Sequence, residues 1–243
     1  METQEIISKP SDSDVSNIEW RDGQPYSIQF QDIYFSSEDG VAETEYVFMQ
    51  GNDLHQRFQQ LKNNQFTIIE TGFGTGLNFL CAINLWLNLA PDNATLHYIS
   101  TEKHPLSLED ISAAQSLWPD LNKLSVAFLK RYQSILNGAT SLLLDNRVQL
   151  TILRADSMSA LSKLQVKADA WFLDGFAPSK NPDMWQDKLF SQMARLSKTT
   201  TTFATFTSAG QVRRGLQAVG FQVLKQPGFG KKREMLVGHY VAT

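Results

Sequence analysis

The segment IIETGFGTGLNFL, residues 68–80, places three glycines at alternate positions between two differently patterned runs. The residues just before them, FTII at 66–69, are apolar and mostly β-branched, which predicts a buried strand. From Leu77 onward apolar residues recur at helical spacing. Glycines between a parallel strand and a helix let the backbone approach a ligand without Cβ atoms in the way. The segment therefore predicts an α/β fold with a ligand beside this turn.

Strand and helix patterns alternate from residue 66 to the carboxyl end. Strands are expected at 66–70, 95–101, 148–154, 169–174, 200–206, 221–225 and 234–240, and helices at 77–89, 107–117, 121–136, 157–164, 184–197 and 209–219. This order predicts a doubly wound, mostly parallel, seven-stranded Rossmann-like sheet. One domain is expected over residues 21–243, with its core at 66–243 and a β-rich extension at 21–65 that holds a hairpin near Glu38–Gly40. Residues 1–20 are expected to form a flexible tail.

Composition fits one globular domain without metal or membrane. Of 243 residues, 42% are hydrophobic and 19% are charged, which is ordinary for such a domain. A single cysteine excludes a disulfide framework, and the polar amino terminus is unlike a signal peptide, so we expect a cytoplasmic protein. The apolar runs are too short to cross a membrane. The four histidines stand apart, so no metal site is expected.

The net charge of −3 conceals an uneven distribution. Residues 1–60 carry 12 acidic and 3 basic side chains, whereas residues 180–243 carry 3 acidic and 10 basic ones. A basic carboxyl-terminal quarter attracts polyanions even when the total charge is nearly neutral. A solvated lysine-rich surface would give the same pattern, so charge alone does not establish nucleic-acid binding.

The residues after the glycine turn exclude two ligand classes. A phosphate-binding P-loop ends in Gly-Lys-Ser/Thr, and that ending does not follow Gly76. A dinucleotide fingerprint has a glycine at its sixth position, where this chain, counted from Gly72, has Leu77. The remaining pattern, Glu-x-Gly-x-Gly-x-Gly over residues 70–76, resembles the first motif of class I S-adenosylmethionine (SAM) methyltransferases. An ordinary glycine-rich turn is the alternative.

In those methyltransferases the glycines make room for the ribose and methionine parts of the cofactor, and the carboxylate at the strand end attracts its ammonium group. The resemblance therefore implies that SAM is the cofactor. It implies cofactor contacts from Glu70, Gly72, Gly74, Gly76 and Asn78.

Four successive strands end in a carboxylate, namely Glu70, Glu102, Asp156 and Asp174. Because the carboxyl ends of parallel strands meet at one edge of a sheet, we expect these groups to converge. Glu102 suits a ribose, since two carboxylate oxygens match two cis hydroxyls. Asp156 could accept a hydrogen bond from an adenine amino group or only cap the next helix, and the same choice applies to Ser157.

The loop Asp174-Gly175-Phe176-Ala177-Pro178 has the layout of the Asp/Asn-Pro-Pro-aromatic motif of amine-directed methyltransferases, with the aromatic residue ahead of the proline. In that motif a carboxylate or amide and a backbone carbonyl accept hydrogen bonds from the nitrogen to be methylated. The resemblance implies that Asp174 orients an acceptor amine or draws off its proton. Phe176 is expected to stack on the acceptor base or to wall off the cofactor, with a plain core role as the alternative.

Longer segments resemble one family more closely. ETGFGTGLNFL, FLDGFAPSKNPDMW, ATFTSAGQVRRGLQAVGF, GFGKKREML and DIYFSSEDGVAETEYVF are similar to the amino-terminal methyltransferase domain of the bifunctional tRNA 5-methylaminomethyl-2-thiouridine biosynthesis proteins, the MnmC family. The resemblance covers residues 25–240. It implies SAM-dependent methylation of the 5-aminomethyl group on the wobble uridine of tRNA. It also implies an FAD-dependent oxidase partner, and a role for Tyr34 in closing over the cofactor.

A tRNA substrate would need cationic contacts near its anticodon region. The candidates are Lys180, Arg213, Arg214, Lys231, Lys232 and Arg233. Two other functions stay open. One is a catalytically silent methyltransferase-like domain that only docks tRNA, and the other is a SAM methyltransferase for a small-molecule amine.

Overall fold

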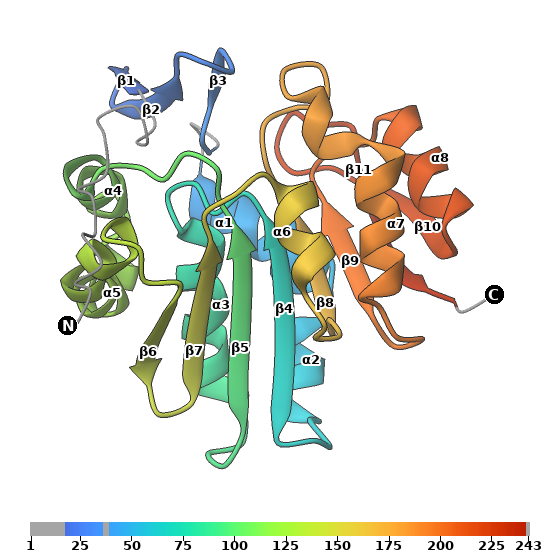
Figure 1. Cartoon of the computed structure of the whole chain (residues 1–243), viewed down its shortest axis with the longest axis horizontal. Helices are drawn as coiled ribbons and strands as arrows, with labels where there is room; N and C mark the ends of the chain where they lie inside the picture. The colour runs from blue at the N-terminus through green and yellow to red at the C-terminus, as the bar shows by residue number, and fades with distance from the viewer. Residues whose placement is uncertain (1–17, 36–38, 242–243) are drawn as a thin grey trace, which may run out of the picture.

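An eight-stranded sheet runs through the centre of the molecule (Figure 1). The computed structural model describes residues 18–35 and 39–241. The strands of this sheet are β4 (Gln65–Thr71), β5 (Thr95–Thr101), β6 (Ser141–Asp145), β7 (Val148–Leu153), β8 (Ala170–Leu173), β9 (Thr202–Thr205), β10 (Phe221–Pro227) and β11 (Glu234–Tyr240). Their order is β10-β11-β9-β8-β4-β5-β7-β6. The five strands from β9 to β7 run parallel, and β10, β11 and β6 pair antiparallel with their neighbours.

The predicted doubly wound, mostly parallel sheet is confirmed, but the count of seven strands is wrong. The additional strand, β6, pairs antiparallel with β7 at the edge of the sheet. Leu142 in β6 is buried, but the next residue, Leu143, is apolar as well and is 60% exposed, so the run SLLLD does not show the alternation of apolar and polar residues that marks a half-buried strand. A short edge strand of this kind gives a weak sequence signal.

Helices cover both faces of the sheet. They are α1 (Gly40–Thr44), α2 (Leu54–Gln59), α3 (Leu77–Leu89), α4 (Leu108–Gln115), α5 (Asn122–Leu136), α6 (Ser157–Lys163), α7 (Asp187–Arg195) and α8 (Gly210–Ala218). Three shorter turns are the π-helix η2 (Glu45–Gln50) and the 3₁₀ helices η3 (Pro119–Leu121) and η4 (Pro182–Trp185). Helices α2, α3 and α5 pack into one core and α6, α7 and α8 into another, on the opposite face. In β4 the side chain of Ile68 belongs to the first core and that of Ile69 to the second, which explains why the strand is apolar throughout.

The predicted β-rich extension is confirmed by three strands between residues 18 and 33, but it is wrong over residues 40–59, which form α1, η2 and α2. The Asp39 side chain caps α1 by accepting a hydrogen bond from the backbone N–H of Ala42. The buried residues Val47, Leu54 and Phe58 then form an apolar stripe against the sheet and α3. This stripe, rather than the alternation of aromatic and acidic residues, decides the local structure.

Two other predictions for the amino-terminal part fall partly outside the described residues. The predicted hairpin near Glu38–Gly40 includes residue 38, which lies outside them, and α1 already begins at Gly40. The predicted tail at 1–20 lies outside them up to residue 17, whereas its last residues belong to β1.

A small antiparallel sheet stands over the carboxyl edge of the main sheet (Figure 1). It consists of β1 (Ile18–Arg21), β2 (Gln24–Ser27) and β3 (Asp32–Ile33). From β4 the chain proceeds outward to β5 and β7, and it then returns to β8 and β9 on the other side of β4. The connections after β4 and β8 therefore diverge, which leaves a crevice at this edge, where open α/β sheets bind their ligands.

Candidate active site

A cavity of about 810 Å³ lies at the carboxyl edge, between the main sheet and the small amino-terminal sheet. The predicted site residues that line it are Tyr34, Gly72, Gly74, Asn78, Glu102, Asp156, Ser157, Asp174, Phe176, Lys231 and Lys232. Within the described part of the chain, its lining does not include Glu70, Gly76, Lys180, Arg213, Arg214 or Arg233. The four strand-end carboxylates do converge on this edge, although Glu70 lies beneath the cavity surface with 1% of its area exposed.

The glycine turn lies against the loop that follows β8. Gly72 has a φ of +86°, and a Cβ there would lie 3.4 Å from the Cα atom of Gly175. Gly74 has a φ of +52°, and a Cβ there would lie 3.3 Å from the Tyr34 ring. Larger residues at these positions would be strained and would crowd the cavity wall. Gly76 has a φ of +75° and precedes the first residue of α3.

Glu102 follows β5 and joins the glycine turn to the next loop. Its Oε2 atom accepts a hydrogen bond from the backbone N–H of Gly74 at 2.9 Å, and its Oε1 atom accepts one from the N–H of His104 at 2.8 Å. Burial raises the pKa of this carboxyl, and these backbone N–H groups oppose the shift. Glu102 also lines the cavity, where a carboxylate can accept a hydrogen bond from a ligand hydroxyl.

Asp156 and Ser157 begin α6 after β7. Asp156 caps the helix, because its Oδ1 atom accepts a hydrogen bond from the N–H of Ser159 at 2.9 Å. The Ser157 hydroxyl instead lies 2.6 Å from the Thr101 hydroxyl, so it does not cap the helix. Capping leaves the second oxygen of Asp156 available at the cavity.

Asn78 links two carboxylates at the bottom of the cavity. Its Nδ2 atom donates to Oε1 of Glu70 at 3.0 Å and to Oδ2 of Asp174 at 2.6 Å. Its Oδ1 atom accepts from the hydroxyl of Thr44 in α1 at 2.9 Å. Oδ1 of Asp174 accepts from the N–H of Gly175 at 2.7 Å. Both amide protons of Asn78 are thus used within the protein, which makes it a residue that holds Asp174 in place.

Burial raises the pKa values of both carboxyls in this network. The pKa of Asp174 rises to about 6, and hydrogen bonds from Gly175 and Asn78 limit the increase. The pKa of Glu70 rises to about 8 because of its burial and the nearby charge of Asp174. At neutral pH we therefore expect Glu70 to be protonated and Asp174 to be a carboxylate.

The raised pKa of Glu70 gives a prediction for stability. A carboxyl whose pKa is higher in the folded chain binds its proton more tightly there, so the free energy of unfolding falls as pH rises from about 4.5 to about 8. Glu70→Gln removes this loss while keeping an acceptor for Asn78. In urea unfolding without ligand, we expect the free energy of unfolding of the variant, relative to that of the wild type, to increase by about 1–3 kcal/mol from pH 5 to pH 8.

The exposed Glu109 in α4 provides the matched control. Glu109→Gln should show the same difference from the wild type at both pH values. A constant difference for Glu70→Gln as well would contradict the assigned titration of Glu70.

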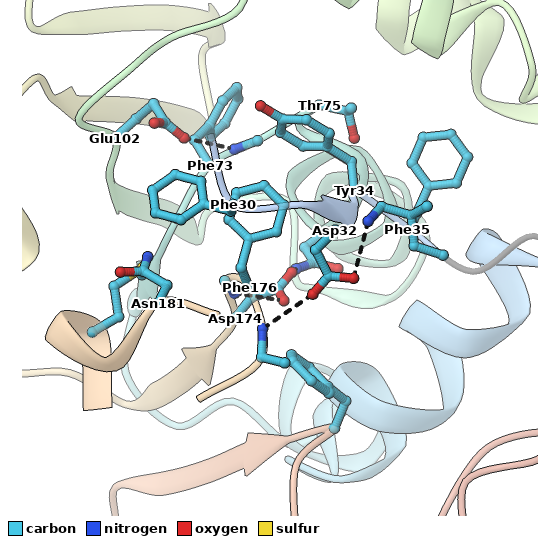
Figure 2. A pocket seen from close by; sticks show the side chains of 18 of the residues that line it. Phe30, Asp32, Tyr34, Phe35, Phe73, Thr75, Glu102, Asp174, Phe176 and Asn181 are labelled. Atoms are coloured by element: carbon cyan, nitrogen blue, oxygen red, sulfur yellow. Dashed lines mark hydrogen bonds between the residues drawn. The ribbon is translucent and has the colours of Figure 1, made fainter. Parts of the chain in front are cut away.

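Aromatic side chains from distant segments form one wall of the cavity (Figure 2). The rings of Phe30 and Phe176 stack with centroids 4.6 Å apart, and Tyr34 meets Phe176 edge-on at 5.2 Å. Asp32 accepts a hydrogen bond from the N–H of Ala177 at 3.4 Å. Sequence reasoning missed Phe30 and Asp32, because only the pairing of the small sheet brings them to the loop after β8.

The candidate cations differ in their surroundings. Lys180, Arg214 and Arg233 are exposed outside the cavity. Arg213 is partly buried, and its Nε atom is fully enclosed. Lys232 lies at the cavity, where its ammonium group pairs with Glu43.

Two predicted absences concern metals and membranes. No group of at least three His, Cys, Asp or Glu side chains within residues 18–35 and 39–241 could hold a metal ion. Across the same ranges, no helix has the length and apolar character needed to span a bilayer.

Comparisons with known proteins identify the family of the chain. Residues 119–241 match the model of a family described as S-adenosyl-L-methionine-dependent methyltransferase. A protein of Methylobacillus flagellatus is 53% identical over 226 residues, covering 93% of this chain and 35% of its own length. One from Chromobacterium violaceum is 51% identical over 226 residues, covering 92% and 34%. Both are named tRNA 5-methylaminomethyl-2-thiouridine biosynthesis bifunctional protein MnmC.

The fold also resembles a solved structure. The crystal structure of MNMC2 from Aquifex aeolicus superposes with a TM-score of 0.77 at 22% identity, over 94% of this chain and 71% of that one. A parallel sheet with a glycine turn and converging acids at its switch point defines an α/β protein that binds a nucleotide-like cofactor. The chain belongs to the family of SAM-dependent methyltransferases. It spans about a third of the length of the MnmC relatives that it matches, 35% and 34% in the two cases above.

Proposed function

We propose that this chain methylates the nitrogen of the 5-aminomethyl group on the wobble uridine of tRNA. The observation that carries the proposal is Asp174, a carboxylate at the cavity whose two oxygens are held by Asn78 and the N–H of Gly175. Such a fixed carboxylate suits an acceptor amine. Relatives that cover 93% and 92% of the chain are named for the biosynthesis of 5-methylaminomethyl-2-thiouridine, which differs from a 5-aminomethyl precursor by one N-methyl group.

In this proposal the cavity has one end for the cofactor and one end for the acceptor amine. The turn at Gly72 and Gly74 leaves room for the ribose and methionine parts of the cofactor, and Glu102 accepts from the ribose hydroxyls. Asp156 accepts from the adenine amino group with the oxygen that capping leaves available, and Tyr34 covers the turn from above. SAM supplies the methyl group as a sulfonium substituent. Three predicted cofactor residues act indirectly. Gly76 allows the turn into α3, Glu70 accepts a hydrogen bond from Asn78, and the Ser157 hydroxyl is hydrogen-bonded to that of Thr101.

Asp174 handles the acceptor end. An alkyl amine is mostly protonated at neutral pH, and it must lose one proton before its lone pair can attack. The carboxylate of Asp174 accepts this proton, directly or through water, and aims the nitrogen at the cofactor. A pKa near 6 makes it a better proton acceptor than a solvated aspartate. The stacked rings of Phe30 and Phe176 offer a face for the uracil.

The partners follow from the relatives. Their shared name describes a bifunctional protein, and this chain matches about a third of each. We propose that an FAD-dependent oxidase, attached or separate, exposes the amine that this chain methylates. The exposed Lys180, Arg214, Lys231 and Arg233 are the proposed phosphate contacts at the anticodon region. A tRNA substrate of this kind implies action in the cytoplasm.

The proposal is tested by incubating the protein with methyl-labelled SAM and bulk tRNA from a strain that lacks the modification. We expect label in 5-methylaminomethyl-2-thiouridine after nucleoside analysis. Label that enters only free small amines would indicate a small-molecule methyltransferase. SAM binding measured by calorimetry without any transfer to tRNA would instead indicate a silent docking domain.

A further inference from the structure

An ion pair inside the cavity joins two segments that are far apart in the chain. Glu43 lies in α1, and Lys232 lies in the loop between β10 and β11, yet Nζ of Lys232 is 2.5 Å from Oε1 of Glu43. The side chain of Glu43 is 13% exposed, and both residues line the cavity. Removing a carboxylate from water is costly unless a cation lies beside it, and here the protein supplies its own cation.

The ammonium group of Lys232 has an aromatic neighbour as well. Its Nζ atom lies 4.5 Å from the centroid of the Phe206 ring, which also lines the cavity. A carboxylate on one side and an aromatic face on the other are the two features that proteins use to bind ammonium groups. The position occupied by Nζ is therefore a ready-made ammonium subsite.

This subsite is connected to Asp174. Glu43 is followed by Thr44, whose hydroxyl donates to Asn78, and Asn78 donates to Asp174. The charges also act on one another, since Glu43 raises the pKa of Asp174 and Lys232 lowers it. Glu43, Lys232 and Asp174 thus belong to the same end of the cavity, opposite in role to the glycine turn and Glu102.

We propose that Glu43 and Phe206 form the subsite that binds the acceptor ammonium, and that Lys232 occupies it until the acceptor enters. This rests on the proposed function, because it assigns the amine-binding residues of that reaction. The side chain of Lys232 is 45% exposed and has a flexible four-carbon stem, so its ammonium group can withdraw toward solvent without movement of the backbone. Lys232 competes with the substrate, and it is not a phosphate contact.

The test uses 5-aminomethyluracil, an acceptor fragment without phosphate, titrated into the protein with S-adenosylhomocysteine present. In the wild type, the side-chain ammonium signal of Lys232 in nitrogen-edited NMR, assigned by its loss in Lys232→Met, should shift as the fragment binds. Glu43→Gln should weaken fragment binding at least about tenfold, the usual scale for losing a charged partner. Lys232→Met should strengthen it about threefold or more, because the competing cation is gone.

Lys225→Met is the matched control, since Lys225 pairs with Glu234 in the same hairpin and both side chains are exposed. It should leave fragment affinity unchanged. Calorimetry with SAM shows whether each variant is folded. If Glu43→Gln is unfolded, the fragment affinity of Lys232→Met still tests the subsite. Equal or weaker fragment binding by Lys232→Met, or no detectable binding, would overturn the subsite. A shifted Lys232 signal without methylation of tRNA would overturn the proposed function and leave the subsite standing.

Discussion

Asp174→Asn is expected to lower the rate constant of methyl transfer by about a hundredfold or more, the usual range for a positioned acid–base group. The affinity for SAM should change much less. Asp174 is proposed to act on the acceptor nitrogen as it reacts, and an interaction made mostly in the transition state lowers turnover while ground-state binding stays nearly intact. Single-turnover rates with saturating SAM, compared with calorimetric SAM affinities, measure the two effects separately.

The geometry of Asp174 requires a check on folding. Its two oxygens accept from Asn78 and from the N–H of Gly175, so an asparagine must turn its amide group toward one of these donors. An unmatched buried donor costs about 1–3 kcal/mol, which urea unfolding will report. Asp120→Asn, at an exposed position outside the cavity, is the matched control and should retain full activity. Full activity in Asp174→Asn would remove this carboxylate from the mechanism.

The pH dependence gives a second readout for the same residue. Burial raises the pKa of Asp174 to about 6, and the proposed active form is the carboxylate. The single-turnover rate of the wild type should therefore rise with pH through about 6 and level off above it, apart from titration of the acceptor amine itself. The residual rate of Asp174→Asn should lack this rise, because no carboxyl remains to ionise.

The central part of the fold was predictable because its signals are local. The run before the glycines, the turn itself and the helical spacing after Leu77 are contiguous, and strand β4 and helix α3 lie where they indicate. The convergence of Glu102, Asp156 and Asp174 followed from one rule about parallel strands, without knowledge of side-chain contacts. Edge strand β6 and the helices at 40–59 depend on which side chains are buried by distant segments, and the sequence pattern misassigned them.

The same distinction holds within the site. The sequence predicts Asn78 as a cofactor contact, and the structure places it at the cavity, where it also bridges Glu70 and Asp174 from two different strands. The pair of Glu43 and Lys232 is separated by 189 positions. The basic run Lys231–Arg233 predicts phosphate contacts, and nothing in it indicates that Lys232 pairs with a carboxylate in α1. Long-range pairing of this kind leaves no local pattern to interpret.

Glu102→Ala is expected to weaken the binding of SAM by about ten- to a hundredfold. The proposed ribose clamp loses charge-assisted hydrogen bonds worth about 1.5–3 kcal/mol, and each 1.4 kcal/mol is a factor of ten in affinity. The loss is compounded because the backbone N–H groups of Gly74 and His104 lose their acceptor, which loosens the glycine turn.

A cofactor analogue separates these two causes. S-adenosylhomocysteine should bind the wild type more tightly than its 2′-deoxy analogue does, because the clamp loses a hydroxyl, and Glu102→Ala should bind the two nearly equally. If the variant still distinguishes the two ligands as strongly as the wild type, Glu102 does not contact the ribose. The effect of Glu102 on affinity would then come from the hydrogen bond that holds Gly74. The ribose would need another partner at this edge, and we would propose the oxygen of Asp156 that does not cap α6.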